Sequence, residues 1–345
     1  MLLLAGWRST GLNHKQTGQQ FLEGQIMSNR PIYGPRQITP SSLCFGAMQF
    51  GAGADEADSA AMYQACREAG VNFFDTAFVY NKGRSEEILG QLITSDRDEL
   101  VLVTKAGAVG GSSPANLRTQ LETSLTRMKQ DYTDIFFLHM FDPDTPLEDS
   151  FAELARLKAE GKFYHLGVSN FAAWQVMKAQ AIARQHGYPE IEILQPMYNL
   201  VKRQAEVEIL PMAKAEHIGV ISYSPLGGGL LTGKYGASAQ DDNARGRLDW
   251  DPKYKTRYGQ NWMHDAATEL SQIASQIGVE AATLAVAWVA HHPAITSPII
   301  SARNEAQLRP SLAAATFEMS DEIYHQLSAL TPRPAPATDR LEEQH

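Results

Sequence analysis

Four side chains suited to proton transfer lie at or just after the ends of three apolar runs. Asp75 ends the first run, and Tyr80 follows it five residues later. The second run ends on Lys105, and the third ends on His139. An ammonium group beside a phenol favours the phenolate and lowers the phenol pKa, and a carboxylate keeps that ammonium charged. With a histidine to orient the substrate, the four form a device that delivers a proton to a carbonyl oxygen.

The spacing of these residues predicts that they meet at one edge of a parallel sheet. Lys105 follows Asp75 by 30 residues, and His139 follows Lys105 by 34. Each interval is about the length of one strand-helix-strand unit. The carboxyl ends of neighbouring parallel strands are where α/β proteins keep their active sites. The device contains no group to attack the carbonyl carbon, and a hydride from a nicotinamide would suit it.

Eight short apolar runs alternate with helical patterns along the chain. The runs begin near residues 43, 72, 100, 135, 164, 191, 219 and 297. The helices are expected at 55–69, 84–92, 114–129, 146–160, 172–185, 206–216, 265–277, 281–291, 306–314 and 321–330. Asp55 is the expected cap of the first helix, and Pro114 is expected at the first position of the third.

This alternation predicts an α/β fold, a (β/α)8 TIM barrel with an N-terminal hairpin at 32–38 and extra helices and loops. An open dinucleotide-binding sheet would need Gly-x-Gly-x-x-Gly after the first strand, and residues 46–51 do not supply it. We expect residues 1–27 to be a disordered leader or an upstream start. Residues 28–331 form a single barrel domain in this interpretation, and 332–345 form a loose tail.

Composition narrows the classes of partner. Of the 345 residues, 43% are hydrophobic and 20% charged, and the net charge of −9 argues against a nucleic-acid partner. No run approaches the roughly 18 to 20 apolar residues of a membrane span, so no membrane partner is expected. The two cysteines, Cys44 and Cys66, fit neither a disulfide framework nor a metal site, which indicates a reducing, cytoplasmic setting without a metal.

From about residue 42 to 330 the chain resembles the aldo-keto reductases, NADP(H)-dependent barrel enzymes. The matching stretches are Phe-Asp-Thr-Ala at 74–77 with Tyr80, Thr-Lys at 104–105, Leu-His at 138–139, Gly-Val-Ser-Asn at 167–170, Gln-Pro-Met-Tyr-Asn at 195–199, the glycine-rich run at 224–235, and Ala-Arg-Asn at 302–304 with Gln-Leu at 307–308. The resemblance implies reduction of small aldehydes and ketones, with Tyr80 as the proton donor.

The resemblance also implies a cofactor site for NADP(H). Ser169, Asn170 and Gln195 would hold the nicotinamide carboxamide, and Tyr223 would stack under its ring. The glycine turn after Ser224 offers backbone N–H groups to a pyrophosphate, and an arginine suits a 2′-phosphate. The expected cofactor-binding residues are Met48, Ser169, Asn170, Gln195, Tyr223, Ser224, Leu226, Gly228, Lys234, Ser301, Arg303, Gln307 and Ser311.

The chain departs from the family pattern at three places. Pro310 and Ser311 stand where the family has an acidic residue and an asparagine that contact the adenine, which predicts a looser grip on it. Ser301 replaces a glycine, and Arg245 and Arg247 compete for the role of a second arginine after Lys234. The expected walls of the substrate pocket are Met48, Phe78, Phe141, Trp174 and the segment 250–262.

Three alternatives stay open at this point. Channel-associated β subunits share the fold and the four catalytic residues and act partly as NADP-binding regulatory modules. A non-redox isomerase or aldolase would use Lys105 as a Schiff base. A sugar or alcohol dehydrogenase would run the same reaction in the oxidative direction. The sequence fixes neither the substrate nor the oligomeric state.

Overall fold

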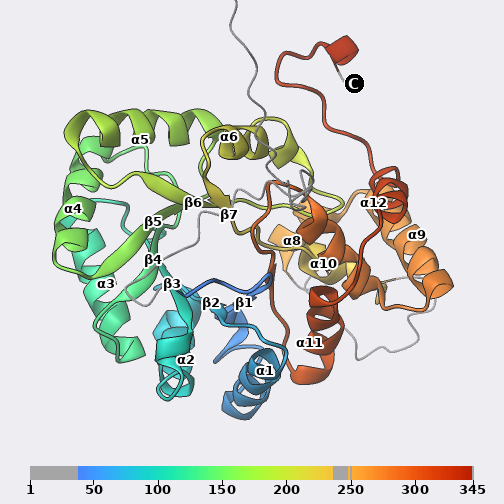
Figure 1. Cartoon of the computed structure of the whole chain (residues 1–345), viewed down its shortest axis with the longest axis horizontal. Coiled ribbons are helices and arrows are strands. Elements are labelled where there is room, and N and C mark those ends of the chain that lie inside the picture. Colours follow the sequence, from blue (N-terminus) through green and yellow to red (C-terminus); the bar gives the residue numbers. More distant parts are fainter. Residues whose placement is uncertain (1–37, 236–247, 249–250, 344–345) are drawn as a thin grey trace, which may run out of the picture.

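Eight parallel strands form the centre of the protein (Figure 1). The computed structural model describes residues 38–235, 248 and 251–343. The strands are β1 (Cys44–Gly46), β2 (Phe73–Asp75), β3 (Val101–Ala106), β4 (Thr133–Leu138), β5 (Phe163–Ser169), β6 (Ile191–Gln195), β7 (Gly219–Val220) and β8 (Ile299–Ile300). Their order is β7-β6-β5-β4-β3-β2-β1-β8, so strands that follow one another along the chain lie side by side.

The two ends of this order meet and close the barrel. The backbone N–H of Ile299 donates to the carbonyl of Ser222 at 2.8 Å, and Tyr223 forms a parallel bridge with Ile299. The predicted (β/α)8 barrel is therefore confirmed. The regular part of β7 is shorter than the predicted strand at 219–224, because beyond Val220 the chain pairs through isolated bridges at Tyr223.

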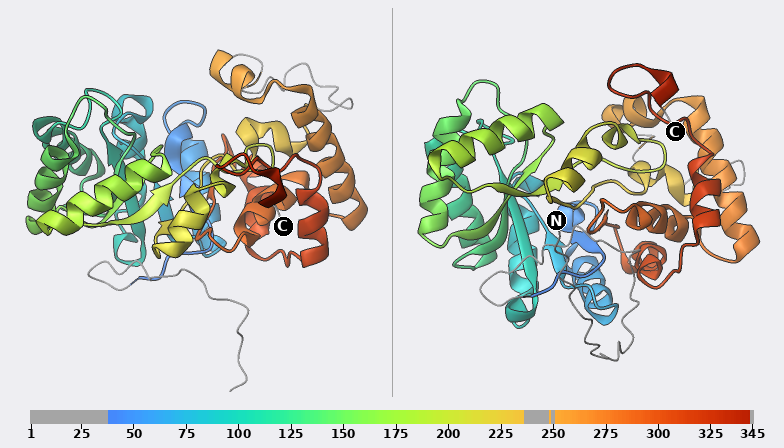
Figure 2. Two further views of the ribbon diagram at one scale, coloured as in Figure 1. Left: turned by 90° about the horizontal axis from the view of Figure 1, so that it is seen from above. Right: turned by 45° about the horizontal axis from the view of Figure 1, so that its top comes forward.

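Helices cover the outside of the strands. They are α1 (Glu56–Glu68), α2 (Arg84–Leu92), α3 (Pro114–Met128), α4 (Leu147–Ala159), α5 (Ala173–His186), α6 (Ile209–Ala215), α8 (Pro252–Tyr258), α9 (Asn261–Ile277), α10 (Ala281–His291), α11 (Glu305–Leu312) and α12 (Asp321–Ser328). In both views of Figure 2 the green helices α3–α5 and the orange and red helices α9–α12 lie on opposite sides of the strands.

Local signals explain where several helices begin. The carboxylate of Asp55 accepts a hydrogen bond from the backbone N–H of Asp58 at 2.9 Å, and Pro114 occupies the first position of α3, both as predicted. Helix α8 was not predicted. It begins with the same signals, since Asp251 caps it and Pro252 opens it.

Some predictions lie outside the described residues. These are the leader, most of the hairpin at 32–38, and the arginines at 245 and 247. Within the tail, 332–340 carries no helix or strand and Leu341–Glu343 forms one 3₁₀ turn. The domain boundaries stay predictions.

The core has two apolar layers, and the alternation of the strands separates them. One layer joins strand residues to helix residues and includes Phe74, Leu102 and Phe136. The other contains no helix residue and consists of strand residues, among them Phe73 and Val103, with Ile221 just after β7, and it fills the inside of the barrel. Because successive side chains of a strand point to opposite faces, residues two positions further along the same strands also face the inside.

Among the helices that the structure describes, no single one combines the length and hydropathy of a membrane span. Only α9 and α10 taken together have the length and composition of a membrane span. Their axes are bent by 100° at the junction between them.

Candidate active site

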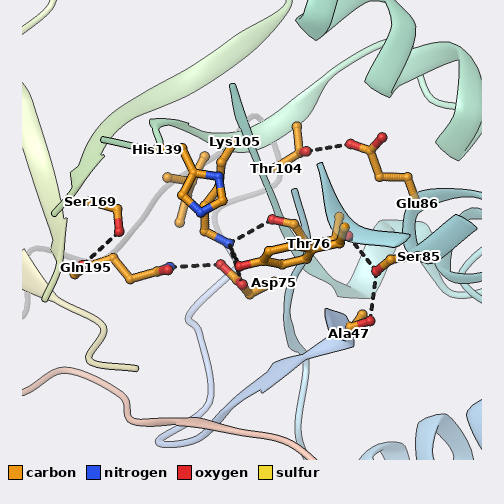
Figure 3. Close-up of polar contacts among 12 residues, drawn as sticks. Ala47, Asp75, Thr76, Ser85, Glu86, Thr104, Lys105, His139, Ser169 and Gln195 are labelled. Atoms are coloured by element: carbon orange, nitrogen blue, oxygen red, sulfur yellow. Dashed lines mark hydrogen bonds and ion pairs between the residues drawn. The ribbon is translucent and has the colours of Figure 1, made fainter. Parts of the chain in front are cut away.

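Three strands bring three of the four predicted catalytic residues to the carboxyl end of the barrel interior (Figure 3). Phe73 on β2, Val103 on β3 and Phe137 on β4 belong to the inner layer. Two residues after these come Asp75, Lys105 and His139 respectively, which the same alternation directs inward. The three side chains therefore meet at one end of the barrel, as predicted, because β2, β3 and β4 pair in parallel with their carboxyl ends side by side.

Lys105 is the centre of the site. Its side chain is 0% exposed, and its ammonium contacts three oxygen atoms. It lies 2.5 Å from Oδ1 of Asp75, 2.8 Å from the carbonyl oxygen of Thr76 and 3.4 Å from the hydroxyl of Tyr80. Burial lowers the pKa of Lys105, but the charge of Asp75 and the hydrogen bonds to Asp75 and Tyr80 together outweigh it and leave the pKa above its ordinary value. Lys105 is thus a protonated side chain with each of its N–H groups directed to an acceptor.

Two opposing effects set the pKa of Tyr80. Burial raises the pKa of this phenol, and the charge of Lys105 lowers it, as the sequence predicts. The net direction is upward, because burial, which the sequence does not indicate, is the larger of the two. The phenol therefore holds its proton at neutral pH.

His139 is a neutral imidazole. Its ring packs edge-on against Tyr80 with 5.8 Å between ring centroids. Burial, together with the positive charge of Lys105, lowers the pKa of His139 from 6.5 to about 3. Nδ1 is buried without a hydrogen-bond partner among the described residues. A neutral imidazole carries one N–H, which can donate to a carbonyl oxygen.

Residues predicted to hold the nicotinamide are linked to the catalytic group. Nε2 of Gln195 donates to Oδ2 of Asp75 at 2.8 Å, and the hydroxyl of Ser169 donates to the carbonyl of Gln195 at 2.9 Å. Asn170 donates to the carbonyl of His139 at 3.0 Å and accepts from the hydroxyl of Tyr223 at 2.8 Å. These side chains come from β5, β6 and the segment after β7, so one network crosses half of the barrel mouth.

The glycine turn after Tyr223, which is the predicted pyrophosphate site, has a left-handed backbone. Ser224 has φ +62°, and Gly227, Gly228 and Gly229 all have positive φ. A Cβ on Gly228 would lie 2.5 Å from the ring of Tyr254. Only glycine therefore fits beside this ring. The N–H groups of Gly227 and Gly229 donate within this glycine cradle, to the carbonyls of Ser224 at 3.0 Å and Leu226 at 2.9 Å, and its use as a phosphate site stays a prediction.

The remaining predicted cofactor residues lie around the same mouth. Leu226 and Met48 are half-buried, and Lys234 is exposed with its ammonium 5.1 Å from the centre of the Tyr235 ring. The Ser301 hydroxyl is buried without a hydrogen-bond partner in the part of the chain that the structure describes.

The last three of these residues are in and before α11. Arg303 is half-buried, and its backbone N–H donates to the side chain of Gln307 at 3.4 Å. Gln307 is exposed. Ser311 is only 1% exposed, so its side chain lies beneath α11 rather than on the surface.

The predicted substrate walls are in part aromatic and accessible. Phe141 packs edge-on against Phe171 at 5.4 Å and against Trp174 at 6.1 Å between centroids. Trp174 is 62% exposed. In the predicted segment 250–262, Trp262 is half-buried, and residue 250 lies outside the described residues.

Sequence reasoning missed the residues that shape the loop carrying Tyr80. Asn81 follows Tyr80 directly and donates to the carbonyls of Met48 at 2.8 Å and Phe50 at 2.7 Å. Glu86 on α2 is 0% exposed and pairs with Arg127 of α3 at 3.0 Å. One signal could have found Glu86, because it falls in register with Leu89 and Ile93 on the apolar stripe of α2.

No metal site accompanies this arrangement in the described part of the chain, where no group of three or more His, Cys, Asp or Glu side chains is placed to hold an ion. The chemistry available from the chain itself is therefore proton donation by a phenol that an ion pair supports.

Comparisons with known proteins agree with this geometry. A sequence profile of the Aldo/keto reductase family matches residues 42–331. The chain is 32% identical to the uncharacterized oxidoreductase YrpG of Bacillus subtilis (strain 168), over 88% of this chain and 96% of the relative. It is 36% identical to the human aldo-keto reductase family 7 member A3, over 78% of this chain and 87% of that protein.

A probable voltage-gated potassium channel subunit beta of Arabidopsis thaliana is 34% identical, over 81% of this chain and 89% of that protein. The relatives thus include both oxidoreductases and a protein named as a channel subunit. On the matched span and these identities, the chain belongs to the aldo/keto reductase family of oxidoreductases.

Proposed function

We propose that the protein is an NADPH-dependent reductase that converts small aldehydes and ketones to alcohols, with Tyr80 as the proton donor. One observation carries the proposal. The Tyr80 hydroxyl lies 3.4 Å from the ammonium of Lys105, which is itself fully buried and 2.5 Å from the Asp75 carboxylate. A phenol in that position keeps its proton until a carbonyl oxygen acquires negative charge, and Lys105 then stabilises the phenolate that remains.

Residues of this chain fit the proposed cofactor. The cradle at Gly227–Gly229 suits a pyrophosphate, Arg303 suits a 2′-phosphate, and Gln195 with Ser169 and Asn170 offers amide and hydroxyl groups to a carboxamide. When bound, NADPH supplies the hydride that reduces the carbonyl carbon. Nothing in the fit depends on Ser311, whose assignment to the adenine stays a prediction.

Each member of the catalytic group has a distinct proposed role. Tyr80 gives its proton to the carbonyl oxygen, and Lys105 offsets the negative charge left on the phenol. Asp75 keeps Lys105 protonated, and Gln195 satisfies the second oxygen of that carboxylate. His139, neutral at physiological pH, donates a hydrogen bond that orients the carbonyl oxygen.

A Schiff-base mechanism on Lys105 is disfavoured by its surroundings. A lysine that forms an imine must lose its proton, which requires a lowered pKa. The contacts with Asp75 and Tyr80 together instead keep the Lys105 pKa above its ordinary value, against the opposing effect of burial. Treatment with substrate and borohydride should therefore leave Lys105 unlabelled.

The direct test is turnover. Purified protein, NADPH and 4-nitrobenzaldehyde should give loss of NADPH absorbance and stoichiometric alcohol, and NADP⁺ with that alcohol should give slow reversal. Binding of NADPH without turnover of any aldehyde, ketone or sugar in a broad panel would favour the regulatory-subunit alternative. Since Cys44 and Cys66 are both buried free thiols, the setting that we propose is the reducing cytoplasm.

A further inference from the structure

The loop that carries Tyr80 has an unfavourable backbone. Asn81, Lys82 and Gly83 follow one another with φ of +50°, +57° and +95°. Glycine adopts this region without a steric cost and asparagine tolerates it, so Lys82 is the residue that opposes the conformation. Such a loop persists only where its surroundings over-determine it. The contacts that hold it therefore decide where the phenol of Tyr80 stands.

Arg127, from α3, contacts this loop at both ends. Its NH1 group donates to the carbonyl of Phe78 at 3.0 Å, and its guanidinium lies over the Phe78 ring, 4.6 Å from the centroid. At the other end, a side chain on Gly83 would collide with the same guanidinium. The loop is thus folded around Arg127, with Tyr80 between the two points of contact.

Glu86 connects Arg127 to the strand that carries Lys105. Its Oε2 accepts from NH1 of Arg127 at 3.0 Å, and its Oε1 accepts from the hydroxyl of Thr104 at 2.7 Å. Thr104 is fully buried and directly precedes Lys105 on β3. The start of the loop is also bonded to β3 directly, since the backbone N–H of Phe78 donates to the carbonyl of Lys105 at 3.0 Å. The carboxylate of Glu86 adds a second connection, through side chains, between the far part of the loop and β3.

A buried ion pair of this kind does not add stability over apolar residues of similar volume, because both groups must leave water. Glu86 nonetheless lies among the buried residues of α2, Ile88 and Leu89 included. What the pair supplies is geometry, since it fixes a loop, a strand and two helices relative to one another.

From these contacts we infer that Arg127 and Glu86 are positioning residues for catalysis: they hold the 76–84 loop so that the Tyr80 hydroxyl stays beside the Lys105 ammonium. Neither residue acts on the substrate. The inference rests on the proposed role of Tyr80 as proton donor, and it adds the requirement that this role depends on α2 and α3. A displacement of about 1 Å at a reacting group can lower a rate by about 10²-fold.

Matched variants separate positioning from general stability. Arg118, on the same helix α3, pairs at 2.7 Å with Glu153, whose side chain is also buried. Arg127→Met and Glu86→Gln should lower kcat by about 10- to 100-fold and leave the NADPH affinity within about twofold. Arg118→Met and Glu153→Gln should leave kcat within about twofold of the wild type.

Two further measurements report on the loop itself. In a Tyr80→Phe background, Arg127→Met should change the residual rate by less than about twofold, because a residue that acts through Tyr80 has nothing left to position. Hydrogen exchange of the amides of 76–84, measured without cofactor, should accelerate about tenfold in Arg127→Met and not in Arg118→Met.

The conservative variant keeps the test available if Arg127→Met fails to fold. Arg127→Lys retains a positive charge opposite Glu86 and should keep more of kcat than Glu86→Gln. The inference is overturned if Arg127→Lys and Glu86→Gln both match the Arg118→Met control, or if their effects persist in full when Tyr80 is phenylalanine. Full turnover by Tyr80→Phe alone would instead overturn the proposed function.

Discussion

The hydroxyl group of Tyr80 lies 3.4 Å from the ammonium of Lys105, although the two residues belong to different strand-helix units of the barrel. The phenol approaches from the loop after β2, and the ammonium rises from the inside of β3. The Tyr80 phenol is a weak acid, and burial makes it weaker. The adjacent Lys105 ammonium can stabilise the phenolate that forms when the phenol gives up its proton. The predictions below concern the groups that create this relationship.

The first prediction concerns the ion pair of Lys105 and Asp75. Lys105→Met leaves a carboxylate in the barrel interior without its cation, so the free energy of unfolding should fall by about 3–5 kcal/mol. Adding Asp75→Asn should recover part of that loss, because the amide oxygen can still accept from Gln195. Urea unfolding of the two single variants and the double variant measures this cycle. A double variant that is less stable than Lys105→Met contradicts the prediction.

The second prediction concerns pH and His139. Its pKa is about 3 in the folded protein and 6.5 ordinarily, so above pH 6.5 the imidazole is neutral in both folded and unfolded states. As the pH falls from 6.5 towards 3, the unfolded state takes up a proton that the folded state refuses, and stability is lost. His139→Gln should therefore lose less stability than the wild type over this range. An imidazole NMR signal of His139 that titrates near pH 6.5 would contradict this assignment.

The third prediction concerns the choice of cofactor. Arg303→Ala should weaken NADPH binding by about 10- to 100-fold, because one or two charge-assisted hydrogen bonds to the 2′-phosphate are lost. NADH lacks this phosphate, and its binding should weaken by less than about threefold. Fluorescence titration measures both. Arg309→Ala is the control, because Arg309 lies on α11 and pairs there with the side chain of Glu305. Equal losses for NADPH and NADH would show that Arg303 does not read the 2′-phosphate.

The fourth prediction concerns the glycine cradle. Gly228→Ala and Gly70→Ala both place a Cβ at positive φ, +68° and +77°. Gly70→Ala should cost about 1–2 kcal/mol of stability, and Gly228→Ala more, because its Cβ also overlaps a neighbouring side chain. Around Gly70 the added atom meets nothing within 4 Å, whereas at Gly228 it meets Tyr254. Only Gly228→Ala should also weaken NADPH binding, by about tenfold or more. If the two variants bind NADPH equally well, the turn is not the phosphate site.

The sequence was sufficient to predict the elements that local pattern controls. Short apolar runs ending in Asp75, Lys105 and His139 gave the strands and their common edge, since alternation and strand spacing are properties of the chain itself. Asp55 and Pro114 marked helix starts for similar local reasons. Helix α8 was missed, although Asp251 and Pro252 carry the same signals, because the surrounding segment is polar and lacks a helical apolar period.

What could not be predicted depends on contacts between distant residues. The pairing of Glu86 with Arg127 joins positions 41 residues apart, and neither position alone indicates the other. The lowering effect of Lys105 on the Tyr80 pKa could be expected from the motif, but the larger, opposite effect of burial could not, because burial is set by the assembled barrel. In the left-handed turn, Asn81 and Gly83 are residues that favour this conformation locally, whereas Lys82 carries no such signal.

The kcat of Tyr80→Phe, measured together with its NADPH dissociation constant, tests the central claim most directly. Removing the only proton that the Tyr80 side chain can donate should lower kcat for aldehyde reduction by about 10²- to 10⁴-fold, while NADPH binding stays within about twofold of the wild type. Full turnover by the variant would contradict the assignment of Tyr80 as the proton donor.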